Sequence, residues 1–332
     1  MKLWFPVSAL LLISCSIVGK HQAHFIAFDT AIDVTVYSAS RAADDDIDLL
    51  RDLFARLEDK LSISKPESEI CRINTRRDSI VVVSDTLRSI LKICRAEYTQ
   101  SGGLFDVTVG PLKYLYGLEA HQAETHVPTQ QELDSVMGLV GFGRIKFVSD
   151  SILIMPRGVT LDFGGIAKGY ALEAARLFLR AKGYTSFMIN AGGDLIAEST
   201  KPAGVSWRIG IQNPRVHENL VATLDVADRC VFTSGDYERC FVNDGIRYHH
   251  LFDPKTGRPG RYNMSSTVVG KNPLTTDADV KIAFLKPPEK ALEYCTSKGL
   301  PALVIDSTGA GWANELMKPL LKPDSAFVVN YR

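Results

Sequence analysis

Residues 159–194 place two glycines and a lysine in a pattern that suits a phosphate group. The apolar run 159–163 predicts a buried strand, Gly164-Gly165 ends it, and apolar residues spaced three and four apart over 166–179 predict a helix. The first N–H groups of a helix have no partner within it, and the helix dipole is positive there. Lys168 lies in that first turn, where the dipole disfavours a cation. An ammonium beside free N–H groups suits a phosphate. The alternative is a packing turn with a solvated lysine, and this stretch alone does not separate the two.

A second candidate segment is the polar run 248–259, which contains two adjacent histidines and is constrained by proline and glycine. Such a segment is costly to order, so it more often marks a site than an ordinary loop. His250 is a candidate general acid or base, or a hydrogen-bond donor to phosphate. The alternative is a histidine that holds the Asp253-Pro254 turn. Strand alternation predicts that His249 faces the other way and tolerates substitution.

The composition excludes some classes of function. The formal net charge of the 332 residues is zero and no long basic stretch is present, so nucleic acid is not expected as a partner. The length suffices for one large domain or two lobes around a sizeable core.

The N-terminal residues predict export. The apolar run after Lys2, residues 3–13, is too short to span a bilayer and is typical of a secretory signal peptide. Its end, Leu12-Ile13-Ser14-Cys15, resembles the lipobox of bacterial lipoproteins, which implies cleavage before Cys15 and lipidation of that cysteine. We therefore expect a signal peptide at 1–14, a lipidated tether at 15–24 and one domain at 25–332. The expected location is the bacterial cell envelope, lipid-anchored to a membrane and facing the periplasm or the exterior. The alternative is a plain signal peptide with an incidental cysteine.

Five further cysteines follow Cys15, and an odd number cannot all pair internally. Cys230 and Cys240 flank a predicted turn and are candidates for a disulfide in an oxidising compartment. Buried free thiols are the alternative. No CxxC or Cys/His metal spacing is present.

Local patterns predict the other regular elements. Strands are expected at 31–37, 79–83, 186–190 and 207–211, and helices at 44–61, 84–98, 129–139 and, as an amphipathic helix, after 275–279.

Several of these stretches, in order along nearly the whole mature chain, resemble one known family. They are residues 28–30, 68–74, 103–112, 161–169, 190–194, 233–239 and 250–259. On them the chain resembles the ApbE family of FAD:protein FMN transferases, in which a lipobox is also common. That family splits the pyrophosphate of FAD, attaches FMN to a Thr or Ser hydroxyl of a partner protein and releases AMP; some members hydrolyse FAD to FMN and AMP instead. Both reactions require Mg²⁺.

The resemblance implies an α+β fold with mixed, largely antiparallel sheets, packed helices and two lobes around a flavin cleft. Its implied partners are FAD and an exported or membrane redox protein that accepts the flavin. It implies catalytic roles for Lys168, His250 and Asp277, and Mg²⁺ ligands at Asp277 and the carbonyl of Ala167. The residues expected to bind FAD are Phe28, Asp29, Asp106, Asp162, Gly164, Gly165, Lys168, Ser234, Gly235, Asp236, His250 and Thr256.

The sequence departs from the family at one metal ligand. The family motif D-A-x-x-T maps its aspartate to Asp277 and places Lys281 where the threonine should be; a shifted register would use Asp279 and Ala283. Asp277 and Lys281 are one helical turn apart, so the ammonium is expected to compete with Mg²⁺ for the carboxylate and to slow turnover. Two alternatives are an ammonium that replaces the metal charge and a lysine that points to solvent.

Three functions are therefore compatible with the sequence: an FMN transferase, an FAD-binding lipoprotein with weak or no transferase activity, and an FAD pyrophosphatase. Residues 306–311 loosely resemble a flavin-acceptor motif. Gly311 stands where the modified hydroxyl would be, and a hairpin turn at Thr308-Gly309 is the better interpretation.

Overall fold

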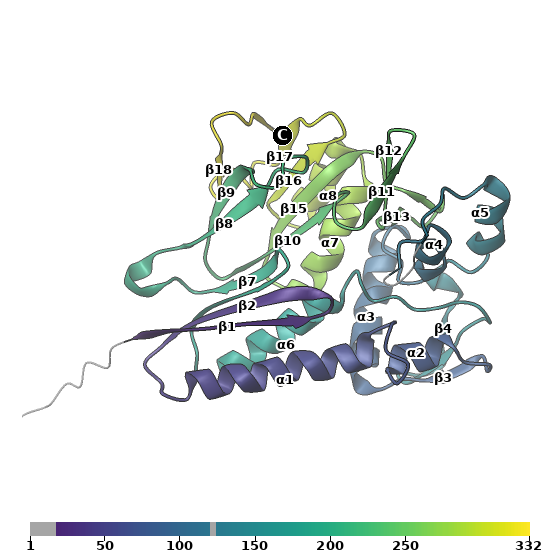
Figure 1. Cartoon of the computed structure of the whole chain (residues 1–332), viewed down its shortest axis with the longest axis horizontal. Coiled ribbons are helices and arrows are strands. Elements are labelled where there is room, and N and C mark those ends of the chain that lie inside the picture. Colours follow the sequence, from purple (N-terminus) through teal and green to yellow (C-terminus); the bar gives the residue numbers. More distant parts are fainter. Residues whose placement is uncertain (1–17, 120–123) are drawn as a thin grey trace, which may run out of the picture.

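A nine-stranded sheet runs through the computed structural model, which describes residues 18–119 and 124–332 (Figure 1). Neighbouring strands are antiparallel except for the last pair, which is parallel. In spatial order the strands are β1 (Gly19–Ala27), β2 (Thr30–Ser38), β6 (Ser186–Ala191), β7 (Asp194–Glu198), β10 (Arg229–Gly235), β15 (Asn263–Gly270), β16 (Ala302–Asp306), β17 (Gly311–Ala313) and β19 (Val329–Tyr331).

Helices cover one face of this sheet and a small second sheet packs against the other. The helices are α1 (Ala43–Leu61), α6 (Ala167–Ala181), α7 (Pro273–Leu285) and α8 (Pro288–Ser297), and they enclose the largest apolar core with the sheet. The second sheet has the order β18 (Leu321–Pro323), β9 (Leu220–Val226) and β8 (Trp207–Gln212). Its core includes Trp207 and Leu224 and the side chains of Leu195, Val231 and Val269 from the large sheet.

Most of the remaining elements form a second lobe beside the helices. Its core lies among α2 (Glu69–Asn74), α3 (Asp85–Gln100) and a sheet of β3 (Ile80–Val82), β5 (Ile152–Ile154) and β4 (Lys146–Phe147). Smaller pieces are α4 (Gly110–Leu115), α5 (Gln130–Met137), the pair β11 (Cys240–Asn243) and β12 (Ile246–His249), the pair β13 (Phe252–Asp253) and β14 (Arg258–Pro259), and the 3₁₀ turn Phe142–Arg144. A second 3₁₀ turn, Pro202–Gly204, lies outside this lobe, between β7 and β8.

Local sequence signals account for most of these elements. The alternating apolar residues Ile32, Val34 and Val36 of β2 all point into the core. Acidic residues open α1, and the Ser84 side chain caps α3 by accepting the Leu87 N–H. The α+β class with largely antiparallel sheets is thus confirmed.

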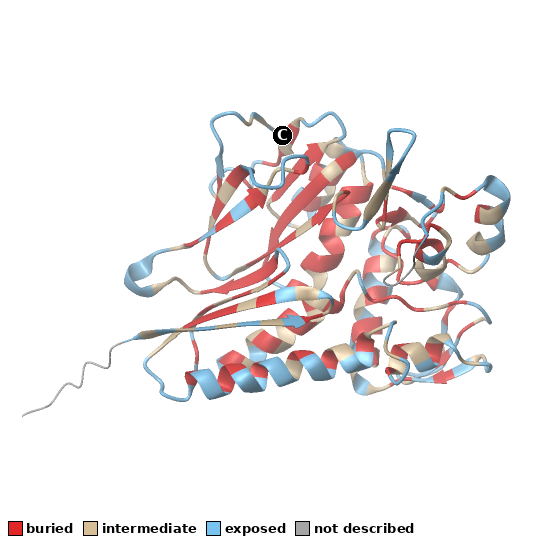
Figure 2. Ribbon diagram, in the orientation of Figure 1, coloured by how far each residue is buried: buried red, intermediate tan, exposed pale blue. Residues whose placement is uncertain are grey.

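Helix α7 differs from its prediction, because it is buried on nearly all sides and has no polar face (Figure 2). Its buried positions include Thr276, Asp277 and Asp279 beside apolar residues. Such a helix is interior rather than amphipathic. Each buried polar group therefore needs a partner inside the protein.

The predicted strand 159–163 is wrong. The segment is buried, but it is not part of a sheet. Its backbone bonds to side chains and loops instead: the N–H and C=O of Leu161 bond the Asn74 side chain at 2.7 and 2.8 Å, and the Asp162 N–H donates to the Val107 carbonyl at 2.7 Å. Asn74 therefore satisfies the backbone polar groups that a neighbouring strand would otherwise satisfy.

Two further expectations need correction. Cys230 and Cys240 are both free: the Cys230 thiol is buried and donates to the Thr276 hydroxyl, and Cys240 lies beside Arg247, so no disulfide joins them. Residues 19–24, assigned to the tether, belong to β1 and pair with β2.

The signal peptide and Cys15 lie outside the described residues. Within the described part of the chain, no helix has both the length and the apolar character needed to cross a membrane.

Candidate functional site

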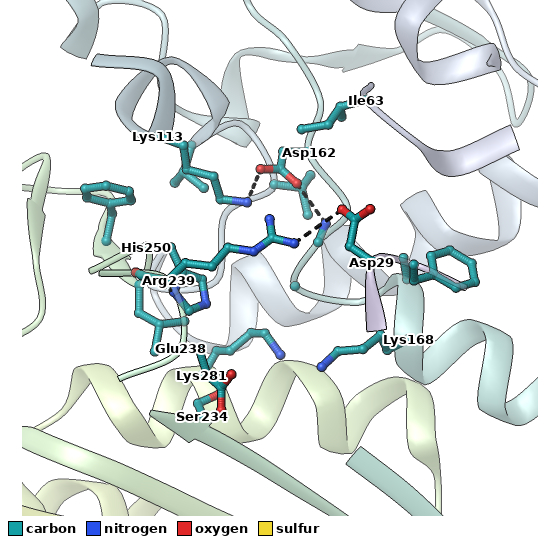
Figure 3. A pocket seen from close by; sticks show the side chains of 18 of the residues that line it. Asp29, Ile63, Lys113, Asp162, Lys168, Ser234, Glu238, Arg239, His250 and Lys281 are labelled. Atoms are coloured by element: carbon teal, nitrogen blue, oxygen red, sulfur yellow. Dashed lines mark hydrogen bonds and ion pairs between the residues drawn. The ribbon is translucent and has the colours of Figure 1, made fainter. Parts of the chain in front are cut away.

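A pocket lies where the two lobes and the end of the large sheet meet (Figure 3). Its walls come from the β1–β2 turn, the end of α1, the loop 104–109, the start of α6, the end of β10, residues 250–254 and α7. The predicted site residues that line it are Phe28, Asp29, Asp106, Asp162, Gly164, Gly165, Ala167, Lys168, Ser234, Gly235 and His250. Segments far apart in the sequence thus converge as expected.

The glycine turn and Lys168 form one wall of the pocket, but carboxylates of the chain already occupy part of the anion site. The Gly164 N–H donates to Asp162 at 2.8 Å, and the Gly169 N–H donates to Asp277 at 2.8 Å. Lys168 is ion-paired with the buried Asp194, and its side chain is 27% exposed toward the pocket. Burial lowers the pKa of Lys168, but the carboxylates of Asp194 and then Asp277 outweigh burial and raise it, so the amine is charged.

Lys113 is a second cation in the pocket. It extends from α4 and is ion-paired with the buried Asp162 (Figure 3). Burial favours the neutral form of Asp162, but Lys113 and the Gly164 N–H outweigh burial and hold the pKa of that carboxyl below its usual range. Asp162 therefore remains an anion that positions both Lys113 and the glycine turn.

Lys281 is a third cation in the pocket. Its ammonium contacts the Asp277 carboxylate one helical turn earlier and donates to the Asp277 carbonyl at 2.9 Å. Asp277 is fully buried and lies behind the pocket wall. Burial raises the pKa of Asp277, although Lys281 opposes this. The predicted neighbour relation of these two residues is confirmed.

Asp279 lies in a different cluster. Its carboxylate accepts hydrogen bonds from Lys298 at 2.6 Å and from the Tyr294 hydroxyl at 2.5 Å, away from the pocket lining. The geometry therefore favours the register that assigns Asp277, and not Asp279, to the site. Because this carboxylate is buried and ion-paired, Asp279→Ala is expected to affect the stability of the fold rather than the pocket.

His250 faces the pocket together with Arg239 (Figure 3). Burial and then the charge of Lys113 hold the pKa of His250 well below its ordinary value, so the ring is neutral. Its Nδ1 lies 3.4 Å from the Arg239 carbonyl, and in the tautomer that donates to this carbonyl Nε2 is an acceptor. Arg239 in turn reaches Asp29 on the β1–β2 turn at 3.4 Å.

His249 faces away from the pocket, as predicted, but its surroundings argue against the predicted tolerance to substitution. Its ring is buried and packs edge-on against Phe284, 5.4 Å between centroids. Nδ1 accepts from the Leu251 N–H at 3.3 Å and Nε2 donates to the Gly260 carbonyl at 2.8 Å. Both nitrogens of this histidine thus bond the backbone of the segment that carries His250.

Three predicted ligand-binding residues have other roles. Asp236 is paired through both oxygens with Arg215, at 2.7 Å each, and does not line the pocket. Thr256 is exposed in a turn outside the pocket, where its hydroxyl accepts from the Arg258 N–H. Asp106 lines the pocket, but its oxygens accept from Thr108 and from the Phe142 N–H, which holds its own loop in place.

Four further charged residues line the pocket, and no role was predicted for them: Lys113, Asp194, Glu238 and Arg239. Asp194 and Arg239 lie within the segments 190–194 and 233–239, which resemble the ApbE family, and no other sequence feature indicated a role for them. No sequence feature indicated a role for Lys113, because its partner Asp162 is distant in the sequence and only the fold brings the two together.

Together, three lysines and an arginine surround a glycine turn in a pocket between two lobes, and this arrangement defines a protein that binds a large anionic ligand. The profile of the ApbE family matches residues 28–304, and the chain belongs to that family.

Known relatives agree in sequence and in fold. An FAD:protein FMN transferase from Vibrio cholerae is 30% identical over 276 residues, which cover 81% of this chain and 82% of the relative. One from Escherichia coli K12 is 28% identical, with 93% and 94% covered. The crystal structure of the ApbE protein from Thermotoga maritima has 29% identity and a TM-score of 0.85, covering 91% of this chain and 99% of its own. The flavin transferase ApbE from V. cholerae has 26% identity and a TM-score of 0.81, covering 91% and 100%.

Proposed function

We propose that this protein is an FAD:protein FMN transferase. The observation that carries the proposal is the set of cations around the Gly164-Gly165 turn: Lys168, Lys281 and Lys113 line one pocket with His250. A pyrophosphate needs such neutralisation before a nucleophile can attack it, and catalysis of this kind depends mainly on positioning and electrostatics.

In the proposed reaction, a hydroxyl oxygen of the acceptor protein attacks the phosphorus on the FMN side of the pyrophosphate. A new phosphoester bond forms, and the bond between that phosphorus and the bridging oxygen breaks. The bonding electrons leave with AMP. The hydroxyl proton passes to a base, for which the neutral Nε2 of His250 is the proposed acceptor. The acceptor is proposed to be an exported or membrane redox protein.

Mg²⁺, which the resemblance implies, does not fit the residues as they stand. Among residues 18–119 and 124–332, no group of three or more His, Cys, Asp or Glu side chains is arranged to hold a metal. The two carboxylate oxygens of Asp277 are engaged, one by the Lys281 ammonium and one by the Gly169 N–H. A fixed ammonium repels a divalent cation at the same carboxylate. The proposed neutralisation of the pyrophosphate therefore rests on the chain's own cations.

We also propose that Cys15 carries a lipid and holds the enzyme at a membrane of the bacterial cell envelope, facing the periplasm or the exterior. The lipobox-like run before Cys15 supports this location.

The test of the function is incubation with FAD and a peptide that contains a Ser/Thr-Gly-Ala-Thr segment, with and without Mg²⁺, followed by mass spectrometry. The expected product is the peptide esterified with FMN, together with one equivalent of AMP. A peptide with alanine in place of the last threonine is the control and should remain unmodified. Release of FMN and AMP without peptide modification would identify a hydrolase, and unchanged FAD would leave only a binding protein.

A matched variant tests the role of His250. His250→Ala is expected to lower the transfer rate at neutral pH while FAD still binds. Wild-type transfer by this variant would leave His250 with only a structural role in its loop.

A further inference from the structure

The ammonium of Lys281 reaches the pocket at the glycine turn. Its aliphatic stem lies against Gly165, where a Cβ atom would be only 3.3 Å from Lys281 Cδ. The side chain is 16% exposed, and this exposure is toward the pocket that it lines. Gly165 thus leaves room for a long side chain from α7 that a larger residue would obstruct.

Asp277 holds this ammonium in place. The Lys281 ammonium donates to both the carboxylate and the carbonyl of Asp277. The other carboxylate oxygen accepts the Gly169 N–H. Because the Asp277 side chain is completely buried, removing its cation would leave an uncompensated charge inside the protein. The Asp277 carboxylate is therefore held by Lys281 at one oxygen and by the Gly169 N–H at the other, and it fixes the Lys281 ammonium in turn.

Lys281 still has hydrogen-bonding capacity toward the pocket. An ammonium has three N–H donors, and Asp277 accounts for two of them. Figure 3 shows the ammonium groups of Lys281 and Lys168 pointing toward one another in the pocket. Lys168 is itself held by Asp194. Two fixed cations thus converge beside the glycine turn, at the place where the sequence predicts a phosphate.

We propose that the Lys281 ammonium takes the place of a divalent cation, so that Lys168 and Lys281 bind the pyrophosphate of FAD directly and without metal. This inference rests on the proposed function, whose substrate it shares. The ammonium supplies one positive charge and a directed N–H donor, whereas a divalent cation supplies two charges. Binding therefore needs no metal, and stabilisation of the transferring phosphoryl group is weaker than a metal would give.

The test measures FAD affinity by titration calorimetry, in excess chelator and in excess Mg²⁺. The wild type is expected to bind FAD with the same affinity in both, within about twofold. Lys281→Gln, which keeps an N–H donor for Asp277 but has no charge, is expected to lose about tenfold to a hundredfold in affinity in chelator, the range for a charge-assisted hydrogen bond. Lys281→Arg keeps the charge and is expected to retain most of the affinity.

The matched control is Lys286→Gln, the same change at the C-terminal cap of the same helix and outside the pocket lining. It should bind FAD as the wild type does. Circular dichroism of each variant establishes that it is folded. The wild-type comparison in chelator and in Mg²⁺ needs no variant, so it tests the inference even if Lys281→Gln does not fold.

A second readout follows the metal itself. Lys281→Thr removes the ammonium and adds a hydroxyl, and it is expected to bind Mn²⁺, measured by water-proton relaxation, where the wild type does not. Its FAD affinity should be weak in chelator and should recover with Mg²⁺. Mn²⁺ binding by the wild type at the same affinity as Lys281→Thr would overturn the inference.

The two proposals fail in different ways. Wild-type protein that binds FAD and modifies the peptide only with Mg²⁺ would overturn the role of Lys281 and leave the transferase function intact. Metal-independent FAD binding that depends on Lys281, without peptide modification, would support the role of Lys281 and reject the transferase. Absence of FAD binding under both conditions would reject both.

Discussion

Replacing His249 by glutamine is expected to remove a pH-dependent part of the protein's stability. The ring is buried, its Nδ1 accepts the Leu251 N–H and its Nε2 donates to the Gly260 carbonyl, so the folded protein holds it neutral. Burial lowers the pKa of His249 from 6.5 to about 4, against the Gly260 bond and the Asp236 charge, which raise it. The unfolded chain therefore binds a proton between these two values that the folded protein does not.

The sign and size of the effect follow from this difference in proton binding. The contribution of His249 to the free energy of unfolding is intact above pH 6.5, falls as the pH drops from 6.5 to 4, and does not fall further below that. At about 1.4 kcal/mol per pKa unit, the loss is about 3 kcal/mol. Other groups titrate in the same range, so the quantity to measure is the difference between wild type and His249→Gln.

The assay is urea denaturation at pH 7, 6, 5 and 4. At pH 7 the wild type should be the more stable protein, and its advantage over His249→Gln should shrink by about 3 kcal/mol at pH 4. His217→Gln, a change at an exposed histidine, is the control and should show no comparable change. An advantage that stays constant with pH would refute the reasoning and show that His249 titrates normally in the folded protein.

Three other substitutions test separate parts of the structure. Lys168→Ala is expected to weaken FAD binding about tenfold to a hundredfold by calorimetry, because it removes a charged donor to the pyrophosphate; equal affinity would reject the phosphate role. Asp279→Ala is expected to lower the free energy of unfolding by about 2 kcal/mol, because the Tyr294 hydroxyl and Lys298 lose a buried acceptor, although Lys298 keeps Glu97; FAD affinity per folded molecule is expected to be unchanged. A loss of FAD affinity in that folded variant would show that Asp279 contributes to the binding site. Cys15→Ala is expected to abolish incorporation of labelled palmitate, and continued labelling would show that the lipid is elsewhere.

The elements predicted from sequence are those whose signals are local. The strand predicted at 31–37 and the helix predicted at 84–98 each depend on a few neighbouring residues, and both are present, as β2 and α3. The strand predicted at 159–163 is absent, because apolar content predicts that a segment is buried but does not predict its hydrogen-bond partner. That partner, Asn74, lies 87 residues from Leu161 in the chain.

In the candidate site, too, the residues predicted correctly are those with a local sequence signal. Lys168 and the glycine turn are close together in the sequence, so the sequence alone predicts a phosphate site there. The pairing of Asp29 with Arg239 joins residues 210 positions apart, and no local pattern predicts it. Asp236 was misassigned because its neighbours Ser234 and Gly235 do line the pocket, whereas its own carboxylate turns toward Arg215.

The burial of α7 on nearly all sides bears on how the site moves. The helix carries Asp277 and Lys281, and its apolar residues belong both to the core under the large sheet and to the core of the second lobe, for example Val280 and Ile282. It cannot separate from either core without exposing both. Its amide hydrogens should therefore exchange with solvent only through global unfolding, while those of exposed loops exchange through local opening. The ammonium of Lys281 thus sits on one of the slowest-exchanging segments of the molecule, and the ligand must adapt to its position.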